Sequence, residues 1–524
     1  MIDLFASPTI LGLVLLGTTL GITVGAIPGL TGTMLIALSL PLTFSMEPVS
    51  GLVLLVAMYV GAVSGGLISA TLLRMPGTPA AIMTTLDGFP MATSGQPGRA
   101  LGLGVGASLF GGLISWLALW QLSEPMADLS TKLGPFELFS LVILALAMLA
   151  GIGDSTPARG LLAGSLGVLV AMPGMHPASG ELRWTFGLTF MNEGFRLIPV
   201  LIGMFAIGKI LQDVTSKDGK VEEVSGNDSA WISLPVWVSN LFNLIRSSVI
   251  GTFIGILPGI GANIGSLAAY MAAKRASKKP ERFGKGSEEG IIASEAANNA
   301  TVGGALIPLI SLGIPGSVIG AVLLGALIVH GLQPGPLLFR QNPEAIHAII
   351  GTVLIANIMM FVIMVGCAKW IARLSAIPKK ILFPTVTLCC IWGAYALNGM
   401  WFDVLVMLLF GILGWRMEKA KLPLAAFVIG FVLAPIAEEN LCAGLMASGG
   451  SYLPLVTRPL SLCLLICSVF HRVHVLEPLW THPSLLIRHA DARWLLHALR
   501  LIFLDIAPCL QHHALLSPIL PLRV

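Results

Sequence analysis

Three polar residues in the second half of the chain have the types and the spacing that could bind an ion. Glu295 precedes Asn298 and Asn299 by three and four residues, so in a helix one carboxylate and two amides share a face. Polar groups are costly inside a membrane, and there they commonly line a path for a substrate or ion. The spacing predicts that these three residues form an ion-coupling group. Two alternatives are hydrogen bonding between helices by the asparagines and a helix-capping role for Glu295 at the cytoplasmic interface.

Proline next to glycine interrupts several apolar segments. Proline removes a backbone donor, and in hydrocarbon the freed groups are tolerated only where they face protein, water or a ligand. Helix N-termini exposed at such breaks suit a carboxylate, while unwound carbonyls with Asn and Thr side chains suit a hard cation such as sodium. Hinge or packing roles are the alternative for the glycines. The expected substrate or ion ligands are Gly29, Thr31, Gly32, Gly77, Thr78, Gly259, Asn263, Gly316 and Ser317.

The breaks recur in the same order along the chain, which indicates an internal repeat. The matched pairs are Gly25-Ala-Ile-Pro-Gly-Leu30 with Gly255-Ile-Leu-Pro-Gly-Ile260, Met75-Pro-Gly-Thr78 with Ile314-Pro-Gly-Ser317, and Gln96-Pro-Gly98 with Gln333-Pro-Gly335. These pairs predict that residues 8–125 and 238–360 are equivalent. Paired broken segments of this kind point to the binding site of a transporter.

The loops after the first break of each repeat differ in charge, which predicts their orientation. Residues 44–50 contain no Lys or Arg, and the equivalent loop of the second repeat is basic. Its cations are Lys274, Arg275, Lys278, Lys279, Arg282 and Lys285. Since cytoplasmic loops carry an excess of Lys and Arg, the second loop is expected in the cytoplasm and the first outside it. The two repeats are therefore expected to be inverted.

Composition sets the fold class. The chain has 524 residues, of which 55% are hydrophobic and 11% charged, whereas soluble domains average about 25% charged residues. We expect an all-α integral membrane protein with about 10–12 transmembrane helices, some of them broken or re-entrant at the Pro-Gly sites. The net charge of +4 gives no support for nucleic-acid binding, and the seven cysteines have no zinc-type pairing.

The chain divides into four predicted segments. Residues 1–205 form an N-terminal transmembrane half, 206–230 a polar linker and 231–470 a C-terminal transmembrane half. Residues 471–524 form a tail that holds most of the ten His residues and no Lys. Because its composition differs from the rest of the chain, we expect the tail to be foreign to the membrane core.

Motifs for soluble enzyme chemistry are missing from the sequence. There is no Gly-x4-Gly-Lys-Ser/Thr loop, no His-Glu-x2-His and no Gly-x-Ser-x-Gly. We therefore expect neither an enzyme nor a bound cofactor. For the ion-coupling group at Glu295, the expected coupling ion is a sodium ion or a proton. A channel or exporter of the same architecture is one alternative. A membrane-embedded enzyme is another, although no nucleophile and base can be named for it.

The motifs resemble those of the large permease subunit of the tripartite tricarboxylate transporter family. The resemblance covers about residues 1–462, and it is carried by residues 25–32, 75–90, 98–102, 255–261, 283–286, 295–299, 305–308, 313–316 and 330–336. It implies a secondary transporter of the bacterial inner membrane that imports carboxylates by symport. It also implies two partners, a small four-helix membrane subunit and a periplasmic solute-binding protein.

Overall fold

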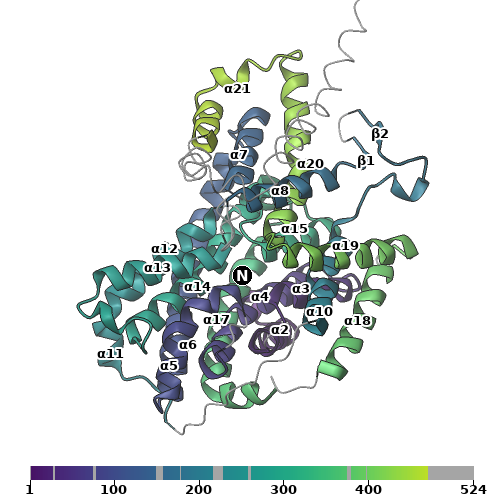
Figure 1. The fold of residues 1–524 in the computed structure, drawn as a ribbon. Helices are drawn as coiled ribbons and strands as arrows, with labels where there is room; N and C mark the ends of the chain where they lie inside the picture. The colour runs from purple at the N-terminus through teal and green to yellow at the C-terminus, as the bar shows by residue number, and fades with distance from the viewer. Residues whose placement is uncertain are drawn as a thin grey trace, which may run out of the picture. The chain divides into compact units, whose positions relative to one another are not determined.

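The computed structural model describes residues 2–27, 30–74, 78–148, 157–176, 179–215, 228–257, 261–374, 379–396 and 398–469. Almost all of the described residues with regular secondary structure lie in helices (Figure 1). Six described helices are long enough and apolar enough to cross a membrane, and several shorter helices are apolar as well. The predicted class of all-α membrane protein is confirmed. The predicted tail, residues 471–524, lies outside the described residues.

The chain forms two compact units, and each is described by itself. Unit 1 consists of residues 1–131 and 196–420, and unit 2 of residues 132–195 and 421–524. Both predicted transmembrane halves contribute to unit 1. The predicted polar linker begins within a continuous helical stretch, because η4 (Gly203–Ile207, a π-helical turn) leads directly into α10 (Gly208–Thr215). Residues 216–227 of the linker lie outside the described residues.

Unit 1 contains both predicted repeats, and their helices follow one another in the same order. The first repeat consists of α2 (Pro8–Ala26), α3 (Gly32–Thr43), α4 (Pro48–Leu72), η1 (Pro79–Ala81), α5 (Ile82–Thr93) and α6 (Pro97–Ser130). The second consists of α12 (Leu241–Ile256), α13 (Gly261–Ala276), η5 (Pro280–Arg282), α14 (Glu288–Leu312), α15 (Val318–Val329), α16 (Pro336–Gln341) and α17 (Pro343–Leu374). Helices α4 and α14 both have 25 residues, and α5 and α15 both have 12. The matched Pro-Gly motifs before α5 and before α15 therefore each follow a helix of 25 residues and precede a helix of 12 residues.

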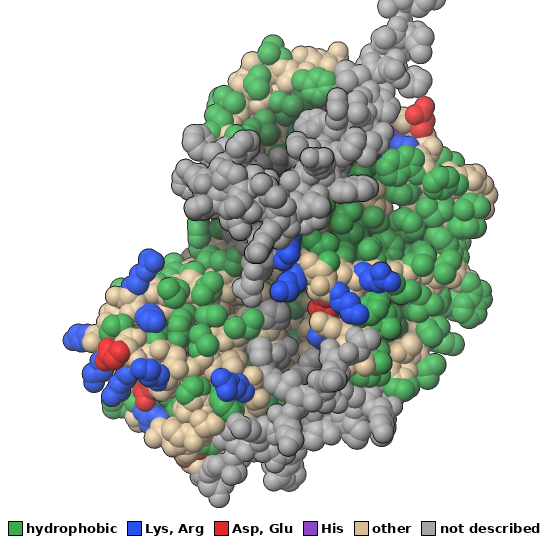
Figure 2. Space-filling view, viewed as in Figure 1, with side chains coloured by type: hydrophobic (Ala, Val, Ile, Leu, Met, Phe, Trp, Pro, Cys, Tyr) green, Lys and Arg blue, Asp and Glu red, His purple; other side chains and the backbone are tan. Residues whose placement is uncertain are grey.

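The remaining helices of unit 1 lie outside the repeats. Besides η4 and α10, they are α1 (Ile2–Phe5), α9 (Leu197–Ile202), α11 (Leu234–Ser239), α18 (Lys379–Ala396) and α19 (Trp401–Lys419). Figure 2 shows Lys and Arg side chains in two groups, one over the region of α13 and α5 and one nearer the centre of the view, with hydrophobic side chains over much of the remaining visible surface. Exposed hydrophobic surface on this scale suits a protein that meets lipid.

Glycines allow the long helices to pack closely, and their contacts show the direction in which each helix runs. Gly17 and Gly21 of α2 pack on α4 near Ala57 and Gly61, so the two helices run in the same direction. Helix α3 lies between them in sequence and must therefore run back against both. In the second repeat Gly251 faces Ala297, and Gly255 lies further along beside Thr301, so α12 and α14 are parallel in the same way. Short returning helices between parallel long ones are what the predicted re-entrant breaks require.

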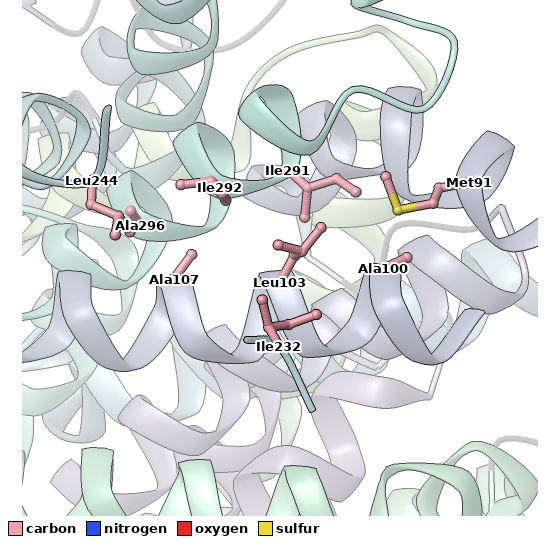
Figure 3. Close-up of a cluster of buried hydrophobic side chains, with 9 residues drawn as sticks. All are labelled: Met91, Ala100, Leu103, Ala107, Ile232, Leu244, Ile291, Ile292 and Ala296. Carbon is pink, nitrogen blue, oxygen red and sulfur yellow. The ribbon is translucent and has the colours of Figure 1, made fainter. Parts of the chain in front are cut away.

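Helices α6 and α14 form the centre of unit 1. They run parallel, since Gly111 packs on Ala296 and Gly303 lies further along against Ser115. A buried apolar cluster fills the space around the first half of this pair (Figure 3). Its members are Met91, Ala100, Leu103, Ala107, Ile232, Leu244, Ile291, Ile292 and Ala296. This cluster fixes α14 against α6 just where the predicted ion-coupling residues begin.

Unit 2 is also mostly helical. Its elements are α7 (Pro135–Met148), α8 (Pro157–Ala171), β1 (Gly174–Met175), β2 (Leu182–Arg183), η3 (Thr189–Met191), α20 (Leu424–Ala447), α21 (Pro454–Thr457) and a further helix at Pro459–Val469. The two short strands pair antiparallel, with Gly174 opposite Arg183. Helices α8 and α20 pack closely, because Gly167 and Gly430 each lie directly on the backbone of the other helix.

Candidate functional site

The three predicted ion-coupling residues are buried together in the middle of α14. Glu295 and Asn298 are 0% exposed and Asn299 is 1% exposed. The helix begins at Glu288, and Ser287 is its N-cap, accepting a hydrogen bond from the Gly290 N–H. Glu295 therefore does not cap the helix, and that alternative is wrong.

The carboxylate of Glu295 is held by hydroxyl groups from the first repeat. Thr84 of α5 donates to Oε1 at 2.5 Å, and Ser108 of α6 donates to Oε2 at 3.2 Å. Among the described residues, no cation forms an ion pair with it. A carboxylate buried in this way either pairs with a bound cation or takes up a proton. The position thus has the chemistry of a site whose charge changes during a working cycle.

The two asparagines differ in how completely they are hydrogen-bonded. Asn299 accepts from Ser64 Oγ at 2.6 Å and donates to Ser108 Oγ at 2.7 Å, so it links α14 to α4 and α6. The helix-to-helix role considered from the sequence is therefore present for Asn299. Asn298 donates to the Val63 carbonyl at 3.4 Å, but its buried Oδ1 has no partner among the described residues. An unpartnered buried acceptor costs about 1–3 kcal/mol, so Asn298 is the better candidate for an ion ligand.

Two predicted breaks from different repeats lie side by side. Thr31 is the N-cap of α3 and accepts from the Met34 N–H, while Ser317 is the N-cap of α15 and accepts from the Gly320 N–H. The two helices contact each other, and a Cβ added at Gly32 would lie 3.4 Å from Ile319 Cδ1. Ser317 Oγ also lies 3.2 Å from the Tyr59 hydroxyl. Two helix N-termini with capping hydroxyls therefore meet beside α4.

The other pair of breaks is described only in part. Thr78 packs on Gly66 of α4, and its buried Oγ1 has no partner among the described residues. The following turn, η1, contacts α13 of the second repeat. Gly316 lies next to Ser317, in the break before α15, and it is buried. A Cβ there would lie 2.7 Å from the Gly255 carbonyl oxygen, so close packing is sufficient reason for this glycine.

Not every predicted ligand joins these groups. Asn263 of α13 is exposed, unlike the buried asparagines of α14. Gly29, Gly77 and Gly259 lie outside the described residues, so their contacts stay a prediction.

Sequence reasoning missed four residues that contact the ion-coupling group or its helix. Ser64, Thr84 and Ser108 supply its hydroxyl partners, and Asp87 binds the loop in front of α14. Single hydroxyls in apolar segments carry little signal, because they are common in membrane helices as packing residues. Asp87 is an isolated acid beside an apolar segment, and that could have drawn attention to it.

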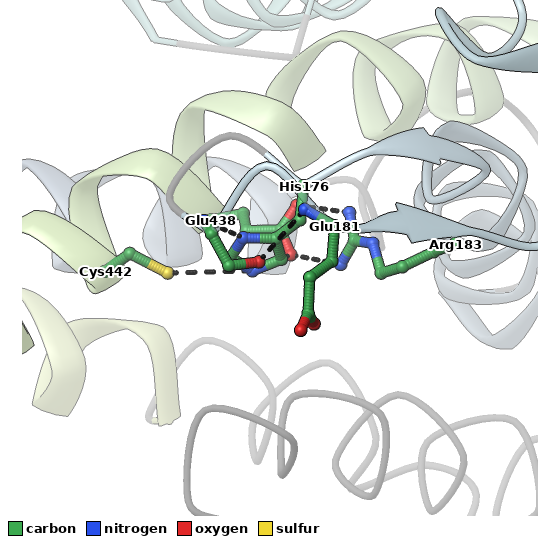
Figure 4. Close-up of polar contacts among 6 residues, drawn as sticks. His176, Glu181, Arg183, Glu438 and Cys442 are labelled. Atoms are coloured by element: carbon green, nitrogen blue, oxygen red, sulfur yellow. Dashed lines mark hydrogen bonds and ion pairs between the residues drawn. The ribbon is translucent and has the colours of Figure 1, made fainter. Parts of the chain in front are cut away.

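Unit 2 contains a polar group that bears on the enzyme alternative, because it brings together a thiol, an imidazole and a carboxylate (Figure 4). Arg183 of β2 binds both oxygens of Glu438 in α20, and His176 Nε2 lies 3.2 Å from Glu438 and 4.0 Å from Cys442 Sγ. His176 Nδ1 accepts from the Ser179 N–H. A nucleophile–base–acid relay needs the two ring nitrogens to face different partners. Here one nitrogen faces both the thiol and the carboxylate, so this group is not such a relay.

Comparison with known proteins gives the family. The profile of the tripartite tricarboxylate transporter TctA family matches residues 11–429. An uncharacterized 52.8 kDa protein in the TAR-I ttuC' 3'region of Agrobacterium vitis is 32% identical over 449 residues, covering 86% of this chain and 89% of that protein. An uncharacterized protein in the TAR-II ttuC' 3'region of the same organism is 34% identical over 188 residues, covering 36% of this chain and 78% of that protein. No solved structure matches. Because the profile spans most of unit 1 and the first relative aligns along most of its length, the chain belongs to the tripartite tricarboxylate transporter TctA family.

Proposed function

We propose that this protein is the large membrane subunit of a secondary transporter that imports tricarboxylates or related carboxylates across the bacterial inner membrane. A sodium or proton gradient drives the uptake. A periplasmic solute-binding protein delivers the substrate, and a small four-helix membrane subunit completes the complex. Membership of the family and the membrane-spanning helices support this proposal.

The observation that carries the proposal is the buried carboxylate at the contact between the repeats. Thr84, Ser108 and Ser64 come from the first repeat, and Glu295, Asn298 and Asn299 from the second. Secondary transporters place their coupling ions between repeats, where broken helices supply further ligands. Glu295 and the unpartnered Asn298 Oδ1 would hold a cation, or Glu295 would carry the proton.

A carboxylate substrate suits the paired N-termini of α3 and α15. Thr31, Gly32, Gly316 and Ser317 would offer backbone N–H groups and hydroxyls at the positive ends of two helices. Helix α4 connects this place to the ion-coupling group, since its Tyr59 contacts Ser317 and its Ser64 contacts Asn299. An anion and a cation bound along the same helix would favour each other, which is the basis of symport.

Inverted repeats are part of the proposal, and the course of α4 supports them. Leu67 of α4 packs on Gly104 of α6, and the earlier Ser64 of α4 contacts Asn299, which also binds the later Ser108 of α6, so α4 runs antiparallel to α6. Because α14 is parallel to α6, the equivalent helices α4 and α14 run antiparallel. Inverted repeats require equivalent helices to run in opposite directions. The crosswise contacts of α3 with α15 and of η1 with α13 have the arrangement that a two-fold axis would produce.

The transport proposal is tested with the chain reconstituted in liposomes together with its two partner proteins. We expect uptake of radiolabelled citrate only when the binding protein and an inward ion gradient are both present. Gramicidin, a channel that conducts both Na⁺ and H⁺ and therefore collapses both gradients, is expected to stop uptake. Uptake that continues at the same rate without a gradient would indicate a channel instead, and citrate efflux without uptake would indicate an exporter.

The inverted repeats are tested by labelling single cysteines in an otherwise cysteine-free chain. Ser45→Cys lies in the loop after α3, which contains no Lys or Arg, and Lys278→Cys lies in the basic loop after α13, and both positions are exposed. A maleimide that cannot cross the membrane is expected to label Ser45→Cys from the periplasm of intact cells. Lys278→Cys is expected to react only after the cells are opened. Labelling of both positions from the same side would contradict the inversion.

A further inference from the structure

Asp87 makes more hydrogen bonds to the second repeat than any single acceptor of the ion-coupling group. It lies in α5 and is 0% exposed. Its Oδ1 accepts from four successive backbone N–H groups, those of Gly284, Lys285, Gly286 and Ser287, at 2.8, 3.1, 2.9 and 2.7 Å. Its Oδ2 accepts from the Tyr270 hydroxyl of α13 at 2.8 Å. One carboxylate thus holds the end of the α13–α14 loop and contacts α13.

The loop is shaped to surround this carboxylate. Gly284 and Gly286 have φ angles of 84° and 98°, a region that glycine adopts readily and other residues do not. Alternation of such residues turns successive N–H groups inward, which makes a small anion-binding concavity. The negative charge also lies at the N-terminus of α14, where the helix dipole favours it. Asp87 therefore fixes where α14 begins.

The same short helix also contacts the ion-coupling group. Thr84 lies one turn before Asp87 on α5, and it donates to Glu295 two turns into α14. Helix α5 is thus attached to α14 at two points, one at the buried carboxylate and one at the loop. The two points lie one turn apart on the same short helix, so a shift of α5 at one of them would also move the other.

We propose that Asp87 is a positioning residue that links the charge state of Glu295 to closure of the loop at residues 284–287. This rests on the proposed role of Glu295 in ion coupling. When Glu295 is charged, it is a strong acceptor for Thr84, and α5 keeps Asp87 in the loop. When Glu295 is neutralised by a cation or proton, Thr84 is held less firmly, and Asp87 releases the loop. The basic loop predicted to face the cytoplasm would then open as the ion binds.

The hydrogen bonds of Asp87 can be followed directly by hydrogen–deuterium exchange of the full-length protein in lipid nanodiscs. In Asp87→Asn, the amides of residues 284–287 are expected to exchange about tenfold faster than in the wild type, because a neutral amide oxygen holds four N–H groups poorly. Asp228→Asn is a matched control, since Asp228 accepts from the Gly98 and Arg99 N–H groups at the start of α6. It is expected to leave residues 284–287 unchanged. Equal exchange at these residues in wild type and Asp87→Asn would overturn the proposal.

The link to Glu295 is tested by the same measurement. Glu295→Gln mimics the neutral state and is expected to speed exchange at residues 284–287 about threefold or more. In a Thr84→Val background the same substitution is expected to have no further effect, because the connection through α5 is already lost. If Glu295→Gln leaves the exchange unchanged, or if the effects of Glu295→Gln and Thr84→Val on the exchange add in full, Glu295 and the loop are not coupled through α5.

Transport kinetics separate positioning from a general folding defect. Asp87→Asn is expected to lower the ion concentration for half-maximal uptake several-fold, because a loop that is already open favours the ion-bound state by linkage, while the maximal rate at saturating ion stays within about twofold of the wild type. A lower maximal rate with an unchanged ion requirement would indicate only structural damage. The exchange measurements do not depend on transport, so they can succeed even if the proposed substrate or coupling fails. The two proposals can therefore fail separately.

Discussion

Glu295→Gln is expected to insert into the membrane at the wild-type level and to lose gradient-driven uptake by about tenfold to a hundredfold, the value of a hydrogen bond to a charged group. The substitution keeps the size of the side chain and removes its charge. The carboxylate is fully buried, and its observed partners are the hydroxyls of Thr84 and Ser108. An amide can replace neither the charge that holds a cation nor the group that carries a proton.

Uptake as a function of ion concentration measures this loss, and Glu288→Gln is its matched control. Glu288 lies two turns earlier on α14, where it is partly exposed and pairs with Arg99 at 2.7 Å. Since exposed ion pairs contribute little, this variant should transport normally. A wild-type rate and ion dependence in Glu295→Gln would remove Glu295 from the mechanism.

The neighbouring asparagines refine the test. Asn298→Ala is expected to weaken apparent ion affinity without reducing the amount of folded protein, because Asn298 Oδ1 has no hydrogen-bond partner in the part of the chain that the structure describes. Asn299→Ala should also lower the amount of folded protein, because it removes the contacts of Asn299 with Ser64 and Ser108.

Gly111→Ala is expected to destabilise unit 1 by about 1–3 kcal/mol, the usual cost of overpacking a close contact. A Cβ at Gly111 would overlap the carbonyl of Ala296, so α6 and α14 would have to separate. Ser108 lies one turn earlier on α6, and the separation would draw it away from Glu295. Both thermal stability and ion-driven uptake should therefore fall.

Thermal unfolding in detergent, followed by the loss of the monodisperse peak in size-exclusion chromatography, measures this effect. Gly12→Ala is the matched control, because a Cβ there would meet nothing within 4 Å. Alanine also favours a helix over glycine, so this control should be neutral or slightly stabilising. Equal stability of the two variants would show that α6 and α14 do not need the close contact at Gly111.

The sequence alone determined the class of the protein, the positions of its helix breaks and the residues that share the polar face of α14. Low charge and long apolar runs require a membrane, and a proline beside a glycine disfavours the interior of a helix. The spacing of Glu295, Asn298 and Asn299 places them together in any helix. These features are local, because they depend on chemistry within a few residues of one another.

Only the tertiary structure decided what these residues touch. Thr84 and Ser108 meet Glu295 from about two hundred residues away, and a hydroxyl in an apolar segment gives no sign of its partner. Packing also gives residues of identical type different surroundings. Asn299 is hydrogen-bonded, Asn298 Oδ1 has no partner within the described ranges, and Asn263 is exposed. The Asp87 contacts depend on a loop of another repeat closing over α5. Such contacts follow from how whole helices pack, which no short stretch of sequence specifies.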